Sequence, residues 1–410
     1  MDILISGAGV AGPSLALWLN RYGHRTTIVE RAPALREGGY AVDFRGEPHL
    51  TVLREMGVLD AVERARTNMG AMWNVNAAGR KLAAMPADLF AGDVEILRGD
   101  LARILHDATR TDTEYVFDDS VTSIDQDPDG VTVGFERAAR RRFDLVVGAD
   151  GLHSTVRSLA FGPESPYLKY LGLHCAVFTT DNYLGLDHTG HAYTTPGRMV
   201  ALYSARENTE AKAVFWFGSP VLDYDRRDVG RQRELLAAAY EGVGWEAGEL
   251  IRRMWRAEDF YFDSISQVRM ESWSRGRVVL LGDAAACPSP LSGMGTGLAV
   301  VSAYVLAGEL AAAPDHRTAF AAYEREVRDY AEGCRRSAEG VAGFMVPENR
   351  FMAWFVNQNH RLLPYLPWKG LMAKSARKTA SAIGLKDYTG FEVTRPGGPA
   401  PRRRPSGRAS

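Results

Sequence analysis

The pattern of apolar and polar positions at the start of the chain predicts a strand, a helix and a second strand. Residues 3–6 form a short apolar run, and residues 26–29 form another, which stops at Glu30. Between the two runs, apolar side chains recur at the spacing of one helical face, at Leu15, Trp18 and Leu19. Gly23 follows at the place where a helix commonly ends.

A glycine-rich turn joins the first predicted strand to the helix. Gly7, Gly9 and Gly12 spell G-x-G-x-x-G, in which glycines allow a tight turn, the approach of a pyrophosphate and close packing of helix on strand. The helix that follows would direct free N–H groups and its positive dipole end at phosphates. At Glu30 a carboxylate can accept hydrogen bonds from two ribose hydroxyls, which favours FAD or NAD over NADP. The unit predicts an ADP-binding site and leaves FAD and NAD open.

Composition limits the classes of protein to which the chain can belong. Its 410 residues suffice for two or three domain-sized units, and 46% hydrophobic with 24% charged residues is ordinary for a globular protein. The formal net charge of -1 gives no support for binding to nucleic acid or to a membrane surface. Cys175, Cys287 and Cys334 have no CxxC spacing, which argues against a disulfide framework or a metal site. With no recognisable signal peptide, we expect a cytoplasmic protein.

Three segments near the C-terminus have distinct patterns. Residues 297–313 are apolar and nearly long enough to cross a membrane, but they contain Glu309 and lack basic flanks, so we expect a buried helix. A helical pattern also covers residues 318–338. The tail, residues 394–410, is rich in Pro, Gly and Arg, and we expect it to be disordered.

Two more apolar runs each end in a pair of glycine and aspartate. One run leads to Asp150 and Gly151, and a later run leads to Gly282 and Asp283, followed by a turn rich in Pro and Gly. Taken alone, Asp150 is explained as a turn residue before a capped helix. Neither aspartate has a nucleophile or a metal-ligand pattern beside it, so spacing alone assigns no catalytic role.

The middle of the chain changes to strand patterns, which predict an antiparallel sheet inserted between the halves of the nucleotide-binding domain. Alternating or apolar runs recur between turn residues, at residues 73–76, 174–179, 190–195, 198–204 and 212–217. Five aromatic residues of this sheet, about two of which we expect to touch a substrate, are Phe178, Tyr193, Tyr203, Phe215 and Phe217. His174 and Arg198 are its notable polar residues, and each is more readily explained as structural than as a base.

As a set, the G-x-G-x-x-G turn, the Asp-Gly pair and the Gly-Asp pair resemble the class A flavoprotein monooxygenases. This is the family of para-hydroxybenzoate hydroxylase, salicylate hydroxylase and the tetracycline-inactivating monooxygenases. The motifs occur in the family order and at family-like separations, and the resemblance covers residues 1–340. It implies an α/β fold: a Rossmann-like FAD-binding domain, an inserted antiparallel β-sheet domain for the substrate, and C-terminal helices. It also implies FAD as the bound cofactor.

The resemblance implies which residues contact FAD. Residues implied for its adenosine and pyrophosphate end are Gly7, Gly9, Val10, Ala11, Gly12, Glu30, Arg31 and Arg98. Asp150 and Gly151 would lie near the cofactor and take part in the use of the nicotinamide nucleotide. Residues implied for the ribityl chain and the isoalloxazine ring are Gly282, Asp283, Pro290, Gly293, Met294 and Gly295. No residue is assigned as a catalytic base.

Two positions depart from the family pattern. Many relatives have His three residues after the aspartate of the Gly-Asp pair, where this chain has Ala286. Many have G-Q-G-x-N in the following turn, where this chain ends the motif with Gly297. We expect FAD binding to survive, because backbone groups carry most of it. The departures keep open a flavin-binding carrier protein that lacks turnover.

The implied reaction is the insertion of one oxygen atom from O2 into an aromatic substrate, either a phenol or a polycyclic natural product. NADPH or NADH would bind transiently and reduce the flavin, and the reduced flavin would take up O2 as a C4a-hydroperoxide. Epoxidation or Baeyer-Villiger oxygenation of a non-aromatic ring stays open. The expected partners are a small-molecule substrate and O2, without nucleic acid or membrane, and the protein would be a monomer or homodimer.

These predictions divide the chain into four parts. The FAD-binding domain comprises residues 1–70, 95–165 and 268–340, and the substrate-binding sheet domain comprises residues 71–94 and 166–267. Residues 341–390 form a C-terminal helical segment, whose aromatic residues would cap the substrate cavity or form a dimer contact. Residues 391–410 form the disordered tail.

Overall fold

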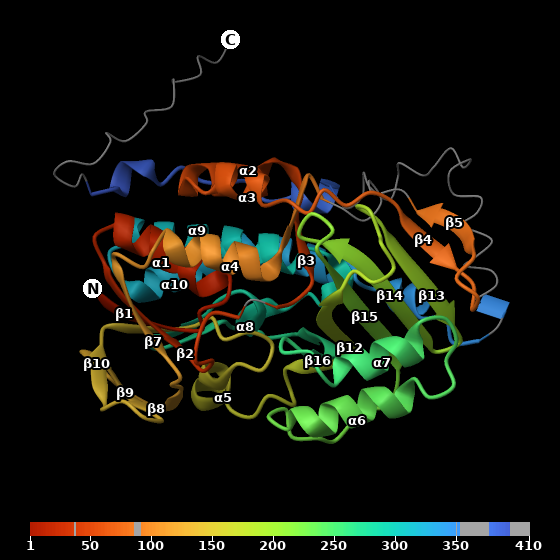
Figure 1. The fold of residues 1–410 in the computed structure, drawn as a ribbon. Coiled ribbons are helices and arrows are strands. Elements are labelled where there is room, and N and C mark those ends of the chain that lie inside the picture. Colours follow the sequence, from red (N-terminus) through yellow and green to blue (C-terminus); the bar gives the residue numbers. More distant parts are fainter. Residues whose placement is uncertain (37, 86–91, 350, 353–376, 394–410) are drawn as a thin grey trace, which may run out of the picture.

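The computed structural model describes residues 1–36, 38–85, 92–349, 351–352 and 377–393 (Figure 1). A six-stranded sheet has the order β17-β18-β11-β1-β2-β7. Its strands are β1 (Asp2–Ser6), β2 (Arg25–Glu30), β7 (Thr113–Phe117), β11 (Leu145–Gly148), β17 (Ser274–Arg275) and β18 (Val278–Leu280). Neighbouring strands run parallel, except β17 and β18. The predicted strand–helix–strand opening is confirmed, because α1 (Ala11–Arg21) connects β1 to its parallel neighbour β2.

The central strands of this sheet are buried because both of its faces are covered. Ile3, Leu4 and Ile5 of β1 and every residue of β11 are buried, as expected for parallel strands between layers of other elements. In Figure 1, the helices on one face are α1, α4 (Arg98–Asp107), α9 (Gly295–Ala312) and α10 (His316–Ser337). The elements on the other face are α5 (Thr155–Phe161) and a three-stranded sheet of β8 (Val121–Asp127), β9 (Gly130–Phe135) and β10 (Arg141–Phe143).

Helix α9 contains residues 297–312 of the predicted apolar segment. By length and composition it could cross a membrane, but 78% of it is buried inside the protein. It packs against α1, α10 and α2 (Gly46–Met56). A helix that is apolar on all sides requires such neighbours, and the expectation of a buried core helix is confirmed. The pattern predicted for residues 318–338 corresponds to α10.

A second, seven-stranded sheet has the order β16-β12-β15-β14-β13-β4-β5. Its strands are β4 (Met72–Val75), β5 (Lys81–Met85), β12 (Leu168–Asp181), β13 (Gly190–Thr195), β14 (Arg198–Ala205), β15 (Glu210–Gly218) and β16 (Tyr261–Val268). Its strand pairs are antiparallel except β13 with β4. Helices α6 (Val229–Ala239) and α7 (Ala247–Met254) cover one face (Figure 1). The other face is turned towards the six-stranded sheet.

The remaining described elements are small. They are the ribbon of β3 (Ala41–Phe44) and β6 (Val94–Leu97), helices α3 (Leu59–Arg64), α8 (Asp283–Ala286) and α11 (Val341–Met345), and single 3-10 turns at Pro290–Ser292 and Thr389–Phe391. The predicted α/β class, with an antiparallel sheet and C-terminal helices, is confirmed. Most of the predicted cap in residues 347–382, and residues 394–410 of the predicted disordered tail, lie outside the described residues.

Gly297 of α9 faces the imidazole of His49 in α2. A Cβ atom at position 297 would overlap the ring of His49, which is fully buried. The Nδ1 atom of His49 accepts a hydrogen bond from the backbone N–H of Arg45 (3.0 Å), so Nε2 carries the proton that is donated to the Tyr330 hydroxyl (2.5 Å). Burial lowers the pKa of His49 to about 4. The departure at Gly297 therefore has a packing reason, because a neutral histidine occupies the space of a side chain.

We expect Gly297→Ala to lower the free energy of unfolding by about 1–3 kcal/mol, because the added methyl group overpacks against His49. In combination with His49→Ala, the loss should be smaller than the sum of the two single losses, because residues in contact are coupled. Urea unfolding followed by circular dichroism measures all three variants. A strictly additive double variant would show that His49 is not the reason for glycine at this position.

Candidate functional site

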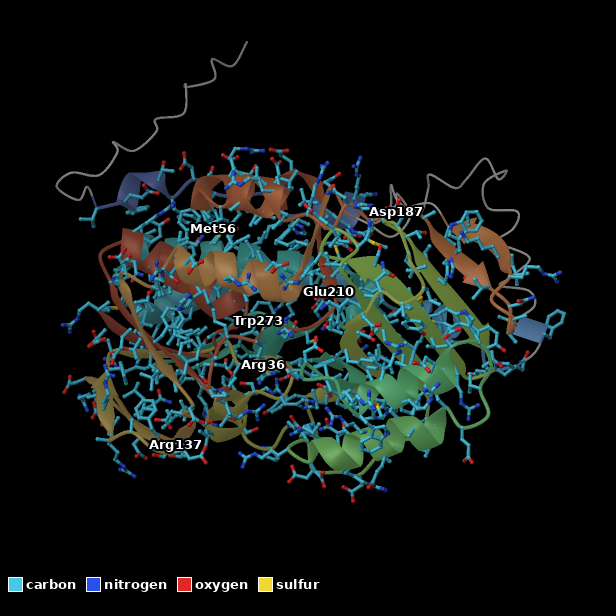
Figure 2. The ribbon with its side chains drawn as sticks, in the orientation of Figure 1. Arg36, Met56, Arg137, Asp187, Glu210 and Trp273 are labelled. Atoms are coloured by element: carbon cyan, nitrogen blue, oxygen red, sulfur yellow. The ribbon has the colours of Figure 1, made fainter. Side chains whose placement is uncertain are left out.

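A cavity of about 1070 Å³ lies between the six-stranded sheet and the open face of the seven-stranded sheet. The glycine turn, the ends of β2 and β11 and the turn before α9 line it on one side, and strands β12 to β15 line it on the other. The carboxyl ends of parallel strands are the usual ligand-binding edge of such sheets. Arg36, one of the lining residues, lies between the two halves of the molecule (Figure 2). The volume is at the upper limit for one small ligand, about 1,000 Å³.

The glycine turn after β1 is closely packed. Gly7 has a φ of 110°, and a Cβ atom there would lie 2.5 Å from the carbonyl oxygen of Ala149. A Cβ atom at Gly12 would overlap the carbonyl oxygen of Gly7, so glycine is required at both positions. Gly12 is buried in this contact. The predicted residues of the turn that line the cavity are Gly7, Gly9, Val10 and Ala11.

The N-terminus of α1 offers free N–H groups at this wall. Within the described residues no side chain caps the helix, so its first-turn N–H groups remain available to a ligand. Glu30 accepts hydrogen bonds from the backbone N–H groups of Ala8 (2.9 Å) and Ala32 (2.9 Å). The carboxylate thereby holds the glycine turn at the end of β2, and Glu30 and the exposed Arg31 both line the cavity.

Arg98, the first residue of α4, faces the glycine turn from the opposite side. Its Nη2 atom would lie 3.8 Å from a Cβ atom at Gly9. Within the described part of the chain, its guanidinium has neither a hydrogen bond nor an ion pair. An uncompensated guanidinium opposite a helix N-terminus suits an anion with several charges, which guanidinium binds in a bidentate manner.

The Asp150 carboxylate organises the start of α5. It accepts hydrogen bonds from the Ser154 hydroxyl and from the backbone N–H of Val156 (3.0 Å), and a longer one from the Ser6 hydroxyl (3.4 Å). Burial raises the pKa of this carboxyl, and the hydrogen bonds from Ser154 and Val156 partly offset the rise. Gly151 has a φ of 82° with open space at its Cβ position. Asp150 and Gly151 both line the cavity.

Gly282 and Asp283 lie where α1, α8 and α9 meet. Gly282 has a φ of 60°, and a Cβ atom there would lie 3.2 Å from Ala11 and 3.4 Å from Ala299. Gly282 is buried in this contact, whereas Asp283 lines the cavity. Burial raises the pKa of the Asp283 carboxyl, and the positive charge of Arg98 partly offsets the rise. Asp283 and Arg98 therefore share one polar region of the cavity.

The turn between α8 and α9 forms the next part of the wall. Ser289 has a φ of 82°, and its hydroxyl accepts a hydrogen bond from the backbone N–H of Leu291 (3.2 Å). No side chain in the described part of the chain caps α9, so a second helix N-terminus offers free N–H groups to the cavity. The predicted residues of this turn that line the cavity are Pro290, Gly293, Met294 and Gly295.

Arg157 connects the two glycine–aspartate segments, a role that the sequence did not reveal. Its side chain is fully buried. The guanidinium donates hydrogen bonds to the carbonyl oxygens of Leu152 (2.6 Å) and Ala284 (3.0 Å), and it lies 3.6 Å from Glu164. Leu152 follows the Asp-Gly pair and Ala284 follows the Gly-Asp pair, so one buried cation fixes both segments. Its only sequence signal is a charged residue in a short apolar helix.

His153 joins the nucleotide-binding half to the seven-stranded sheet and was also missed. Its Nε2 atom is 2.9 Å from the Asp263 carboxylate of β16, and its Nδ1 atom is 3.1 Å from Glu164. Burial by itself would lower the pKa of His153, but the hydrogen bonds to Asp263 and Glu164 outweigh it and raise the pKa above the usual value of 6.5. His153 therefore bridges two carboxylates at the edge of the cavity, and the Nη1 atom of Arg226 lies 2.7 Å from its Nδ1 atom.

Of the five aromatic residues among which we expected about two to touch a substrate, four lie away from the cavity. Phe178, Phe215 and Phe217 belong to the buried cluster beneath α6 and α7, and Tyr193 packs against it. Of the five, Tyr203 lines the cavity. Strand residues alternate between faces, so the cavity receives the neighbouring positions instead, such as Trp216. Because both faces of these strands are apolar, the period of two could not tell which face meets a ligand.

His174 and Arg198 are structural, as expected. The His174 ring stacks on Phe217 and on Phe262, whose ring centroids also lie 6.1 Å from each other, and its Nδ1 atom is 2.8 Å from the Ser219 hydroxyl. Burial lowers the pKa of His174 to about 4. The Arg198 guanidinium donates a hydrogen bond to a backbone carbonyl of α6.

Methionine is frequent in the apolar part of the cavity wall. Among the described residues, six of the chain's 12 methionines line it, namely Met69, Met72, Met85, Met199, Met294 and Met345. Thioether side chains are flexible and polarizable, and they make favourable contacts with aromatic rings. Together with Trp216, they form a surface that can adapt to a flat ring system.

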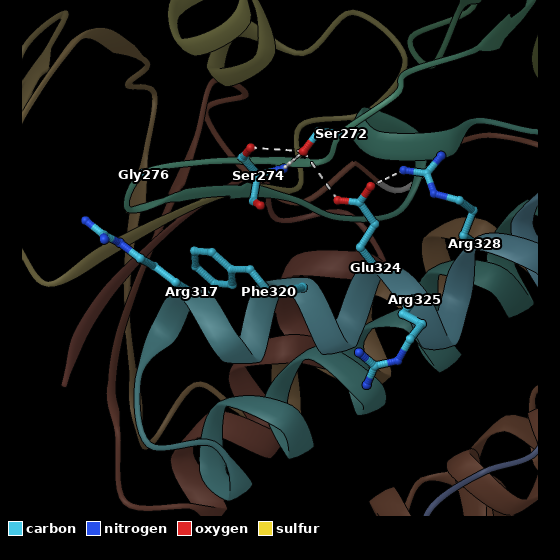
Figure 3. Close-up of a pocket in the computed structure, with 9 residues that line it drawn as sticks. Ser272, Ser274, Gly276, Arg317, Phe320, Glu324, Arg325 and Arg328 are labelled. Carbon is cyan, nitrogen blue, oxygen red and sulfur yellow. Dashed lines mark hydrogen bonds and ion pairs between the residues drawn. The ribbon is translucent and has the colours of Figure 1, made fainter.

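A second hollow, of about 480 Å³, lies on α10 away from these motifs (Figure 3). Glu324 occupies it with its own partners, because its carboxylate accepts hydrogen bonds from Arg328, the Ser272 hydroxyl (3.4 Å) and the backbone N–H of Trp273 (3.0 Å). Among its described lining residues, no buried polar side-chain atom lacks a partner. The described polar groups around the hollow therefore have their partners within the protein, and we assign no ligand to it.

The His153 bridge should make stability depend on pH. A pKa raised by folding contributes stability that is complete below the unfolded value of about 6.5 and is lost as the pH rises through the folded pKa. We therefore expect wild type to exceed His153→Gln in unfolding free energy at pH 5.5, with the difference shrinking towards pH 9. Urea unfolding at the two pH values measures this. A difference that stays constant between them would contradict a charged bridge.

The sequence of the chain is similar to a known family and to known proteins. A family described as "FAD binding domain" matches residues 1–338. A flavin-dependent monooxygenase from an unknown prokaryotic organism is 42% identical over 390 residues, which is 94% of this chain and 98% of the relative. Another flavin-dependent monooxygenase, from Legionella longbeachae, is 40% identical over 355 residues, 85% of this chain and 90% of the relative.

Solved structures agree with this relationship. The crystal structure of tetracycline destructase Tet(51) superposes with a TM-score of 0.83 at 34% sequence identity. The match covers 94% of this chain and 98% of the destructase. The likeness therefore includes both sheets.

Proposed function

The chain belongs to the class A flavoprotein monooxygenases, and from this premise we propose a reaction for its cavity. We infer that it inserts one oxygen atom from O2 into an aromatic substrate, phenolic or polycyclic, with NADPH or NADH as the reductant. The observation that carries this proposal is that one cavity joins the glycine turn, both glycine–aspartate segments and a methionine-rich wall. The motifs account for a dinucleotide, and the wall remains for a second, apolar ligand.

The residues at the motif end fit FAD. The unpaired guanidinium of Arg98 and the uncapped N-terminus of α1 would take the pyrophosphate. Glu30 would accept hydrogen bonds from the adenosine ribose. Asp283 would accept them from the ribityl hydroxyls, because a charged acceptor binds about twice as strongly as a neutral one. The turn from Pro290 to Gly295 would lie along the isoalloxazine ring.

When bound, FAD supplies the redox chemistry, accepting a hydride and activating O2. The chain supplies the surroundings. The dipole of α9, which begins at Gly295, favours negative charge beside the turn. The methionine wall excludes water and packs against the faces of the substrate ring. We assign the approach of the nicotinamide nucleotide to the border formed by Asp150 and Gly151.

In this proposal residues 71–94 and 166–267 form the substrate-binding domain, and residues 1–70, 95–165 and 268–340 form the FAD-binding domain. The tetracycline destructases among the similar structures favour a polycyclic substrate for this chain. The cysteines are free thiols, which supports a reducing cytoplasm as the site of action.

Labelled oxygen tests the proposed function. The FAD-loaded protein is incubated with NADPH or NADH and a panel of polycyclic phenols under labelled O2. We expect a hydroxylated product that contains one labelled oxygen atom, and nucleotide oxidation that the productive phenol accelerates. A labelled lactone would indicate Baeyer-Villiger oxygenation instead of hydroxylation, and a labelled epoxide would indicate epoxidation. Nucleotide oxidation without any labelled product would contradict the proposed function.

Asp283→Ala should give a folded protein that binds FAD about 10–100-fold more weakly, because the hydroxyls of the ribityl chain lose a charged acceptor. Quenching of flavin fluorescence measures the dissociation constant. Asp187→Ala is the matched control, since Asp187 is exposed and bonds to His188 at the surface. An Asp283→Ala protein that binds FAD as tightly as the control would contradict the proposed contact.

A further inference from the structure

Two polar side chains border the methionine-rich part of the cavity from different elements. Tyr203 belongs to β14 of the seven-stranded sheet, and Glu95 belongs to β6 of the two-stranded ribbon. Both line the cavity. Burial raises the pKa of the Tyr203 hydroxyl, and the nearby carboxylates of Glu95 and Asp43 add to the rise. The tyrosine hydroxyl and the two carboxylates therefore lie in one small region.

The Tyr203 hydroxyl has a proton to donate. The residue is only 9% exposed, and its oxygen accepts a hydrogen bond from the backbone N–H of Ala41 (3.1 Å). Among the described residues, no acceptor lies within hydrogen-bond distance of its O–H group. Buried tyrosine hydroxyls normally donate to a partner. A ligand oxygen in the cavity would complete this bond.

The Glu95 carboxylate is anchored through one oxygen. Its Oε1 atom accepts a hydrogen bond from the Thr67 hydroxyl, and in the described chain its Oε2 atom has no such partner. Asp43 lies directly opposite on β3. Asp43 has other partners, because it accepts hydrogen bonds from the backbone N–H of Gly92 (2.7 Å) and from Arg45 (3.2 Å). Glu95 is therefore the carboxylate of the pair that can serve a ligand.

We propose that Glu95 and Tyr203 recognise one polar edge of the substrate. Glu95 accepts a hydrogen bond from a substrate O–H or N–H group, and Tyr203 donates its hydroxyl proton to a carbonyl or ether oxygen on the same edge. The substrate class is a flat, largely apolar ring system that has a donor and an acceptor on one edge and lays its faces on the methionine wall. This inference rests on the proposed function for the position of the substrate.

The charge of Glu95 makes this recognition depend on pH. Burial and the neighbouring Asp43 raise the pKa of Glu95 to about 7, against the opposing influence of Thr67 and Arg45. Tyr203 stays neutral in this range. An ionised carboxylate is the stronger acceptor, so the affinity for a neutral donor ligand should increase as the pH rises through about 7.

Calorimetric titration of the FAD-loaded protein, without nicotinamide nucleotide, tests the inference with three naphthalenes. The probe 2-naphthol carries a donor, 2-methoxynaphthalene has the donor removed, and 2-acetylnaphthalene carries only an acceptor. At pH 8, we expect wild type to bind 2-naphthol about 10-fold more tightly than 2-methoxynaphthalene, because the bond to the carboxylate is charge-assisted. At pH 6 this preference should be smaller. Equal affinities at both pH values, or no binding of any probe, would overturn the inference.

Substitutions assign the preference to its residues. Glu95→Met should remove the preference for 2-naphthol, and Glu95→Gln should retain part of it but lose the pH dependence. Tyr203→Phe should weaken 2-acetylnaphthalene about 10-fold and leave the preference for 2-naphthol in place. Glu47→Gln, at an exposed glutamate of α2, is the matched control, and FAD affinity reports on the fold of each variant. A Glu95→Met protein with the wild-type preference would contradict the inference.

These titrations are independent of turnover. If the protein shows the predicted preferences but transfers no oxygen, the recognition by Glu95 and Tyr203 is supported and the proposed reaction is contradicted. If the protein hydroxylates a phenol without these preferences, the proposed reaction is supported and the recognition is contradicted.

Discussion

The arrangement of the cavity depends on a positive charge that the described chain leaves unpaired. Arg98 extends from the start of α4 towards the glycine turn, where the uncapped N-terminus of α1 adds a second source of positive potential. Two positive groups so close together repel each other when the site is empty and dry. An anion between them stabilises both. The carboxyl of Asp283, whose pKa burial raises, lies within the influence of the same guanidinium. The pyrophosphate of a dinucleotide would neutralise this region.

Close packing around that region fixes the positions of the motifs. Glycine at 7, 12 and 282 lets the turn after β1, the loop after β11 and the helices α1 and α9 approach within contact distance. Arg157 then holds the two glycine–aspartate segments together through their carbonyl oxygens. Because these contacts involve backbone atoms, the cavity has a rigid cofactor end. Its other end is lined by flexible methionine side chains, which suits a ligand whose shape is less strictly defined.

The sequence predicted the rigid end well and the flexible end poorly. Glycines, a strand-terminal acid and an arginine before a helix leave local signals, so Glu30, Arg98 and Asp283 could be found from spacing alone or by resemblance. His153 and Arg157 act through partners far away in the sequence, and no local pattern shows those partners. Which side chains of the sheet face the cavity could not be predicted for a different reason. Strands β14 and β15 are apolar on both faces, so whether Phe215 or Trp216 faces the cavity depends on which face α6 and α7 cover.

Flavin fluorescence at low and high salt measures the affinities of the apoprotein for FAD and riboflavin, and these show whether an anion organises the cavity. We expect FAD to bind far more tightly than riboflavin, and salt to weaken the binding of FAD while leaving riboflavin little changed, because the advantage comes from the pyrophosphate between Arg98 and α1. Riboflavin bound as tightly as FAD, with the same response to salt, would contradict a cavity organised around that anion.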